Sequence, residues 1–135
     1  MKNIALILII AGMAIASCKK EDSNSLFSLL TGPVWTSDSL LANGVDASGP
    51  DGMLKNFKGD AKFNEDGTGY FGIYEGTWRF AYDNTQLVIS SDSLAFPITT
   101  KIAELTAKNL KVTTSYPNLA NPSAPTYIRM TFKAK

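Results

Sequence analysis

The sequence contains no histidine and a single cysteine, Cys18. Histidine is the side chain that most often acts as a general base or a metal ligand near neutral pH. A disulfide within the chain is excluded, because that bond needs two cysteines. We therefore expect a domain that is stabilised by its apolar core alone and that carries no metal site and no cofactor.

An excess of positive charge is also lacking. The chain has 13 basic and 12 acidic residues, and one of the basic residues, Lys2, lies in a segment that we expect to be removed. Proteins that bind nucleic acids use clustered Lys and Arg side chains to displace counterions from phosphates, and the sequence has no such cluster. We therefore expect no nucleic-acid partner.

No apolar run is long enough to cross a membrane as a helix. The longest run, from Ile4 to Ala16, is shorter than the roughly 20 residues that a bilayer requires. It follows the basic Lys2 and ends in small residues, which is the order of parts in a secretory signal. Residues 1–17 are therefore predicted to be a signal peptide.

The signal ends in Ile15-Ala16-Ser17-Cys18. This tetrad resembles the lipobox of bacterial lipoproteins. The resemblance implies cleavage before Cys18, a diacylglycerol on its sulfur, and acylation of the new N-terminus by a fatty acid such as palmitate. Two or more acyl chains hold a protein firmly on a membrane, whereas one holds it only marginally. The alternative is a plain secretory signal with an incidental cysteine.

Residues 18–25 are predicted to be the lipidated cysteine and a polar tether. Lys19, directly after the cysteine, resembles the same position in lipoproteins sorted to the outer membrane of Gram-negative bacteria. Glu21 and Asp22 resemble the tethers of lipoproteins displayed on the cell surface, although a plain solvated linker explains the same charges. The expected location is the outer membrane, with the periplasmic face and the cell surface both left open.

Residues 26–135 are expected to form one domain, since single domains usually have roughly 100 to 200 residues. A short helix is predicted over residues 25–30, because apolar residues recur there at helical spacing before Gly32-Pro33. Alternating apolar residues then predict strands. These strands span residues 34–41, 60–63, 68–74, 77–82, 86–90, 96–105, 110–116 and 126–133.

Eight short strands joined mostly by tight turns indicate an all-β fold, most simply an antiparallel up-and-down barrel with one short N-terminal helix. Turns are expected at Asp66-Gly67, Glu75-Gly76 and Asp83-Asn84. Residues 43–52 and 117–125 are expected to be long loops, and the first is a candidate lid. A change of phase at Leu105 indicates a bulge or the end of the strand.

Several short motifs follow one another in this domain. They are Gly32 with Trp35, Phe63 with Asp66-Gly67-Thr68-Gly69, and Gly76-Thr77-Trp78 with Phe80. In this order after a helix they resemble the lipocalin-like domains of bacterial outer-membrane lipoproteins. The resemblance implies that Gly32 and Gly67 are structural, and that Trp35 lies on the barrel floor beneath Arg129 of the last strand. The chain departs from that pattern in having Gly-Pro-Val-Trp where lipocalins have Gly-x-Trp.

No grouping of reactive side chains specifies an enzyme. Asn64 to Gly67 lacks the alternating ligands of a calcium loop and is typical of a hairpin turn. Ser90 to Ser93 lacks a base to activate a hydroxyl. Glu75 and Glu104 are acidic, but nothing in their spacing places them across a cleft. We therefore predict that the protein is not an enzyme.

The barrel interior offers two functional alternatives, because eight strands enclose either packed side chains or one small ligand. The first is a monomeric binding module for a small apolar or amphipathic molecule. Its expected cavity wall consists of Phe71, Tyr74, Trp78, Phe80, Ile98 and Met130. The second is a filled barrel that presents its loops to a protein or glycan partner. An enclosed apolar cavity of about 300 Å³ or more that opens at one end favours the first alternative, and a packed interior favours the second.

Overall fold

The computed structural model describes residues 23–135, so the predicted signal peptide, Cys18 and the first part of the tether lie outside the described residues. One helix, α1 (Ser23–Thr31), precedes nine strands. The strands are β1 (Trp35–Ala42), β2 (Val45–Asp46), β3 (Asp60–Phe63), β4 (Thr68–Phe71), β5 (Tyr74–Ala81), β6 (Gln86–Ser91), β7 (Ile98–Leu105), β8 (Asn109–Tyr116) and β9 (Thr126–Ala134). A short 3-10 helix, η1 (Lys55–Phe57), lies between β2 and β3.

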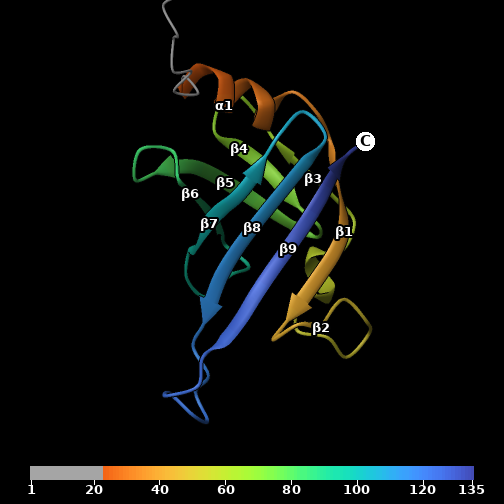
Figure 1. The fold of residues 1–135 in the computed structure, drawn as a ribbon, viewed down its shortest axis with the longest axis vertical. Coiled ribbons are helices and arrows are strands. Elements are labelled where there is room, and N and C mark those ends of the chain that lie inside the picture. The colour runs from red at the N-terminus through yellow and green to blue at the C-terminus, as the bar shows by residue number, and fades with distance from the viewer. Residues whose placement is uncertain (1–22) are drawn as a thin grey trace, which may run out of the picture.

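The strands form a closed antiparallel barrel (Figure 1). From β3 to β9 each strand pairs with the next along the chain, β3 pairs with β1, and β9 pairs with β1 to complete the circle. β2 adds two residues beside the end of β1 and is not part of the circle. The prediction of an all-β up-and-down barrel with one short helix is confirmed. Because the barrel closes within residues 35–134, the segment 23–135 contains its own complete fold.

Side chains alternate between the interior and the outer surface, as the sequence predicts. In β9, Ile128, Met130 and Phe132 are buried, whereas Arg129 between the first two and Lys133 after the third are exposed. The pairs Leu87 and Ile89 of β6, and Ala61 and Phe63 of β3, are buried in the same way. Burial of these apolar side chains is the main source of stability for a chain without an internal disulfide.

Helix α1 lies across one end of the barrel, which we call the closed end (Figure 1). Its Leu30 is fully buried, and its Phe27 ring packs 5.8 Å from the Trp78 ring. Trp35 is also fully buried and donates its indole N–H to the Leu30 carbonyl oxygen at 3.0 Å. This bond satisfies one of the carbonyl groups that a helix leaves free at its C-terminus.

Lys62 of β3 satisfies further carbonyl groups at the end of α1. Its ammonium group donates hydrogen bonds to the carbonyl oxygens of Gly32 at 3.1 Å and Pro33 at 3.3 Å, and also bonds that of Thr31. A cation at a helix C-terminus also interacts favourably with the helix dipole. Lys62 therefore fixes the helix to the barrel from outside.

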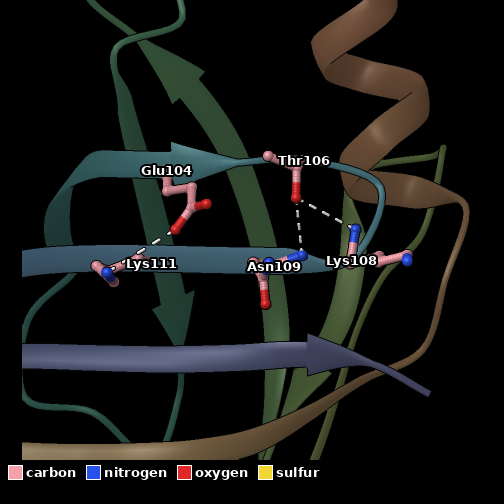
Figure 2. Close-up of polar contacts among 5 residues, drawn as sticks. All are labelled: Glu104, Thr106, Lys108, Asn109 and Lys111. Atoms are coloured by element: carbon pink, nitrogen blue, oxygen red, sulfur yellow. Dashed lines mark hydrogen bonds and ion pairs between the residues drawn. The ribbon is translucent and has the colours of Figure 1, made fainter.

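The turn between β7 and β8 is at the closed end as well, and β7 contacts α1. Figure 2 shows Thr106 in this turn, where its hydroxyl oxygen accepts the backbone N–H groups of Lys108 at 3.3 Å and Asn109 at 3.0 Å. Glu104 and Lys111 form an ion pair of 3.8 Å across the two strands. Such a partly exposed pair contributes little to stability, so hydrogen bonds within the turn hold its shape.

Several predicted boundaries are wrong. The β4–β5 hairpin turns at Gly72-Ile73, where Gly72 has a φ of +62°, rather than at Glu75-Gly76. Gly76 lies inside β5, and a Cβ atom on it would overlap the Ser90 carbonyl oxygen of β6. Glycine is therefore needed there for a close approach of two strands rather than for a turn.

Other differences are smaller. Tyr82, the last residue of the predicted strand 77–82, is 77% exposed, because the β5–β6 turn already begins there, with a φ of +49°. Helix α1 begins at Ser23, so residues 23–25 of the predicted tether belong to the helix. The expected bulge is present as a shift in the β7–β8 pairing between Ile102 and Glu104.

Candidate ligand pocket

The end of the barrel opposite α1, which we call the open end, is bordered by four connections between strands (Figure 1). They comprise residues 43–59, 72–73, 92–97 and 117–125. The two long loops predicted from the sequence both lie within this set, and the first of them contains β2.

A pocket of about 250 Å³ lies at the open end. It is lined by seven apolar side chains, two tyrosines and one threonine: Met53, Leu54, Phe57, Leu94, Ile98, Ile128, Met130, Tyr74, Tyr116 and Thr114. Ligand sites typically combine such an apolar wall with a few polar groups. Its volume is slightly below the roughly 300 Å³ at which drug-sized pockets begin, so any ligand must be small.

Beyond the pocket, the barrel interior is filled. The void between the central side chains measures only about 10 Å³. Phe57 and Met130 border both this void and the pocket. These two side chains therefore form the pocket floor, and the barrel is hollow only at its open end.

The segment carrying Leu54 and Phe57 is held against the barrel by the β4–β5 turn. The Ile73 N–H donates to the Asn56 carbonyl oxygen at 2.9 Å, and the Asn56 side-chain amide donates to the Tyr74 hydroxyl at 3.3 Å. The Phe57 and Tyr74 rings lie 4.9 Å apart. This side of the pocket is thus ordered by hydrogen bonds as well as by ring packing.

Exposed apolar side chains are concentrated at the open end of the barrel. Phe96 and Tyr116 stack with ring centres 5.9 Å apart, and they are 49% and 39% exposed. Of the eight large apolar side chains exposed in residues 23–135, all but Tyr82 belong to connections or strand ends of the open end: Val45, Met53, Ile73, Phe96, Tyr116, Leu119 and Tyr127. We call these seven residues the rim.

The predicted cavity wall is divided between the two ends of the barrel. Tyr74, Ile98 and Met130 line the pocket. Phe71 instead lines the small central void.

The remaining two residues of that wall, Trp78 and Phe80, lie near the closed end with ring centres 5.4 Å apart. The Trp78 indole N–H donates to the Asn64 carbonyl oxygen at 2.9 Å, in the β3–β4 turn. Neither side chain lines the pocket, so the structure does not bring these two residues into one wall with Tyr74, Ile98 and Met130.

The structure does not bring Arg129 over Trp35. Trp35 pairs with Ala134 at one end of the β1–β9 ladder, whereas Arg129 pairs with Leu41 near the other. Arg129 also points outward and is exposed. The basic side chain beside the barrel floor is Lys62, which comes from β3 rather than from the last strand.

The two glycines expected to be structural both occupy tight backbone sites. Gly67 lies in the β3–β4 turn with a φ of +87°, a conformation that other residues rarely adopt. Gly32 follows α1 and donates its N–H to the Ser28 carbonyl oxygen at 3.0 Å.

Most of the pocket-lining residues were not foreseen from the sequence. Met53, Leu54 and Phe57 follow the first long loop at a spacing that fits one helical turn, and this pattern was a usable signal. Leu94 comes from a loop, and Tyr116 ends its strand. Alternation alone does not assign such positions to a pocket.

The titratable groups with shifted pKa values lie outside the pocket. Hydrogen bonds from Ser48 lower the pKa of Asp46, and hydrogen bonds from Thr68 lower the pKa of Asp66. A hydrogen bond from Lys135 lowers the pKa of Asp60. Asp46 and Asp66 are exposed and Asp60 is partly exposed, and each shift reflects a local surface contact. In residues 23–135, no cluster of metal-ligating side chains is present either.

No protein-family model matches the chain, and no curated protein is significantly similar to it in sequence. No helix within residues 23–135 has the length and apolar character needed to cross a bilayer. The pocket is therefore the feature from which a function can be argued.

Proposed function

We propose that this protein is a lipid-anchored, non-catalytic binding protein of the bacterial envelope that holds one small apolar or amphipathic molecule. The observation that best supports binding is the pocket of about 250 Å³ with its largely apolar lining. The closed barrel preceded by one helix is also compatible with the lipocalin-like resemblance of the sequence.

The pocket volume limits the size of the ligand. An apolar cavity of about 150 Å³ accommodates benzene, so about 250 Å³ suits a compound of one or two rings or a short chain. A long acyl chain does not fit, because Phe57 and Met130 close the floor and the interior beyond them is packed.

Native mass spectrometry of the protein extracted from the cell envelope tests this function. We expect a fraction carrying the added mass of one small molecule, distinct from detergent. Ile98→Trp fills the pocket and should lose the added mass. The matched control Thr99→Trp changes the next side chain, which is exposed, and should keep it. A protein that is ligand-free in every preparation would contradict the proposal.

The anchor is tested separately by Cys18→Ala. The variant should leave the membrane fraction, whereas Ser25→Ala, a change on the exposed side of α1, should remain there. Retention of Cys18→Ala on the membrane would exclude lipidation as the cause of attachment.

The exposed rim supports a second candidate, an interaction module that presents this end of the barrel to a protein or glycan partner. Leu119 is 93% exposed, and such apolar side chains are common at recognition surfaces when they gather in one patch. Leu119→Ser should weaken partner binding and leave the small molecule in the pocket. Loss of the small molecule in this variant would argue against a separate rim function.

A further inference from the structure

The pocket lining carries no formal charge. Resting on the proposed binding function, we infer that the pocket selects an uncharged one- or two-ring compound and rejects carboxylates and ammonium ions of the same shape. Seven of its ten lining side chains are apolar, and the other three are hydroxyl-bearing. An ion that leaves water for such a site loses its hydration without gaining an opposite charge.

The cations on neighbouring strands point away from the pocket. Arg129 lies between the inward-facing Ile128 and Met130, so alternation turns its side chain to the outer face. Lys101 follows the fully buried Thr100 and is exposed for the same reason. Neither Arg129 nor Lys101 reaches the interior, so a carboxylate in the pocket would find no cation on the wall.

The hydroxyl groups of the pocket suit a neutral polar substituent. The Tyr74 hydroxyl accepts a hydrogen bond from Asn56 at 3.3 Å, which leaves its own proton for a carbonyl or hydroxyl oxygen of a ligand. The Thr114 hydroxyl donates to the Thr99 carbonyl oxygen at 2.8 Å, so its proton is already used. Tyr116 brings a second tyrosine hydroxyl to the lining. Hydroxyl donors without any cation favour an alcohol, ketone or phenol over a carboxylate.

The remaining wall favours aromatic rings over saturated chains. Met53 and Met130 bring polarisable sulfur to the site, and Phe57, Tyr74 and Tyr116 bring rings. Sulfur–ring and ring–ring contacts add stabilisation beyond that of the buried area. A flat two-ring compound meets these groups from several sides.

Three probes with one skeleton test the charge preference: 2-naphthalenemethanol, 2-naphthoate and 2-naphthylmethylammonium. Each is titrated calorimetrically into the protein spanning residues 23–135 at pH 7.5. We expect the alcohol to bind at least tenfold more tightly than either ion. Equal or tighter binding of an ion would overturn the charge preference and leave the binding function standing. Absence of binding by all three would overturn both.

A charged variant of the wall provides the converse test. Ile98→Lys places a cation in the pocket and should reverse the preference toward naphthoate by at least tenfold. Thr99→Lys adds the same charge one residue further on, at an exposed position, and should leave the preference unchanged. Circular dichroism checks that both variants fold. An identical effect of the two lysines would show a general surface attraction and contradict selection by the pocket wall.

Discussion

The two ends of this barrel are built from similar residues but packed differently. At the closed end, Trp35, Phe63 and Trp78 lie beneath α1 and are buried. At the open end, Phe96 and Tyr116 are equally aromatic but stand partly exposed around a pocket. A short helix that lies across one end therefore covers a packed region of the barrel, and the uncovered end contains the pocket.

The difference between the two ends explains how a small barrel without an internal disulfide can keep a packed core and still contain a pocket. Most of the interior is filled, with a central void of only about 10 Å³. The pocket of about 250 Å³ lies at the end that is bordered by the four connections between strands. Substitutions at the two ends should accordingly have different consequences.

Trp35→Ala should have the largest effect. It removes a fully buried ring and the hydrogen bond to Leu30, and loss of a buried Trp typically costs about 3–5 kcal/mol. Urea denaturation of the protein spanning residues 23–135 gives the free energy of unfolding. Tyr116→Ala, at the rim, should cost about 1 kcal/mol or less. A larger loss for Tyr116→Ala would reverse the assignment of the two ends.

Gly76→Ala should have the next largest effect, because the added methyl group meets the Ser90 carbonyl oxygen in the barrel wall. Overpacking of this kind costs about 1–3 kcal/mol. Gly49→Ala is the control, since a Cβ atom at Gly49, in an open-end connection, meets no atom within 4 Å. Equal urea midpoints for the two variants would show that β5 and β6 do not approach so closely.

Substitutions of Asp66 and Asp46 should have the smallest effect on stability. They compare the two ends of the barrel through the pH dependence of the urea midpoint. Each pKa lies below the ordinary value of 3.8 because of local hydrogen bonds. A lowered carboxylate pKa adds stability well above pH 3.8, and this stability is lost as pH falls through the lowered value. Asp66→Asn, in the closed-end β3–β4 turn, should therefore reduce the drop in urea midpoint between pH 6 and pH 3.

Asp46→Asn, in the open-end connection, should leave that drop nearly unchanged, because this connection can open locally before the barrel unfolds. An equal change in both variants would mean that the two ends unfold as one unit. Two-dimensional NMR titration of each carboxyl group checks that its pKa is lowered.

The fold could be predicted because alternation and turns are local properties. Residues 126–133 alternate so regularly that β9 follows directly, and its apolar residues Ile128, Met130 and Phe132 are the buried ones. The β4–β5 turn was predicted at the wrong position because both Gly72 and Gly76 are residues typical of a turn. Glycine is required at position 76 because the Ser90 carbonyl oxygen of β6 approaches it closely. The sequence around Gly76 does not show this contact, because Ser90 belongs to the next strand.

Only part of the pocket lining could be predicted from the sequence. Alternation of apolar residues along a strand shows which side chains face the interior, but not how far along the barrel axis each one lies. Tyr74 and Trp78 both point inward from β5, yet Tyr74 reaches the pocket and Trp78 packs under α1. Which end is open depends on where the helix lies. That position follows from contacts of α1 with β3 and β7, which are distant in sequence.

The position of α1 also places the N-terminal end of the domain and the pocket mouth at opposite ends of the barrel. The helix begins at Ser23, and Cys18 precedes it by a stretch that reaches at most about 18 Å when fully extended. If Cys18 carries lipid as proposed, the anchor attaches at the closed end. The mouth and rim then project toward the aqueous compartment, so that ligand exchanges with solution or with a facing protein rather than with the bilayer that holds the anchor.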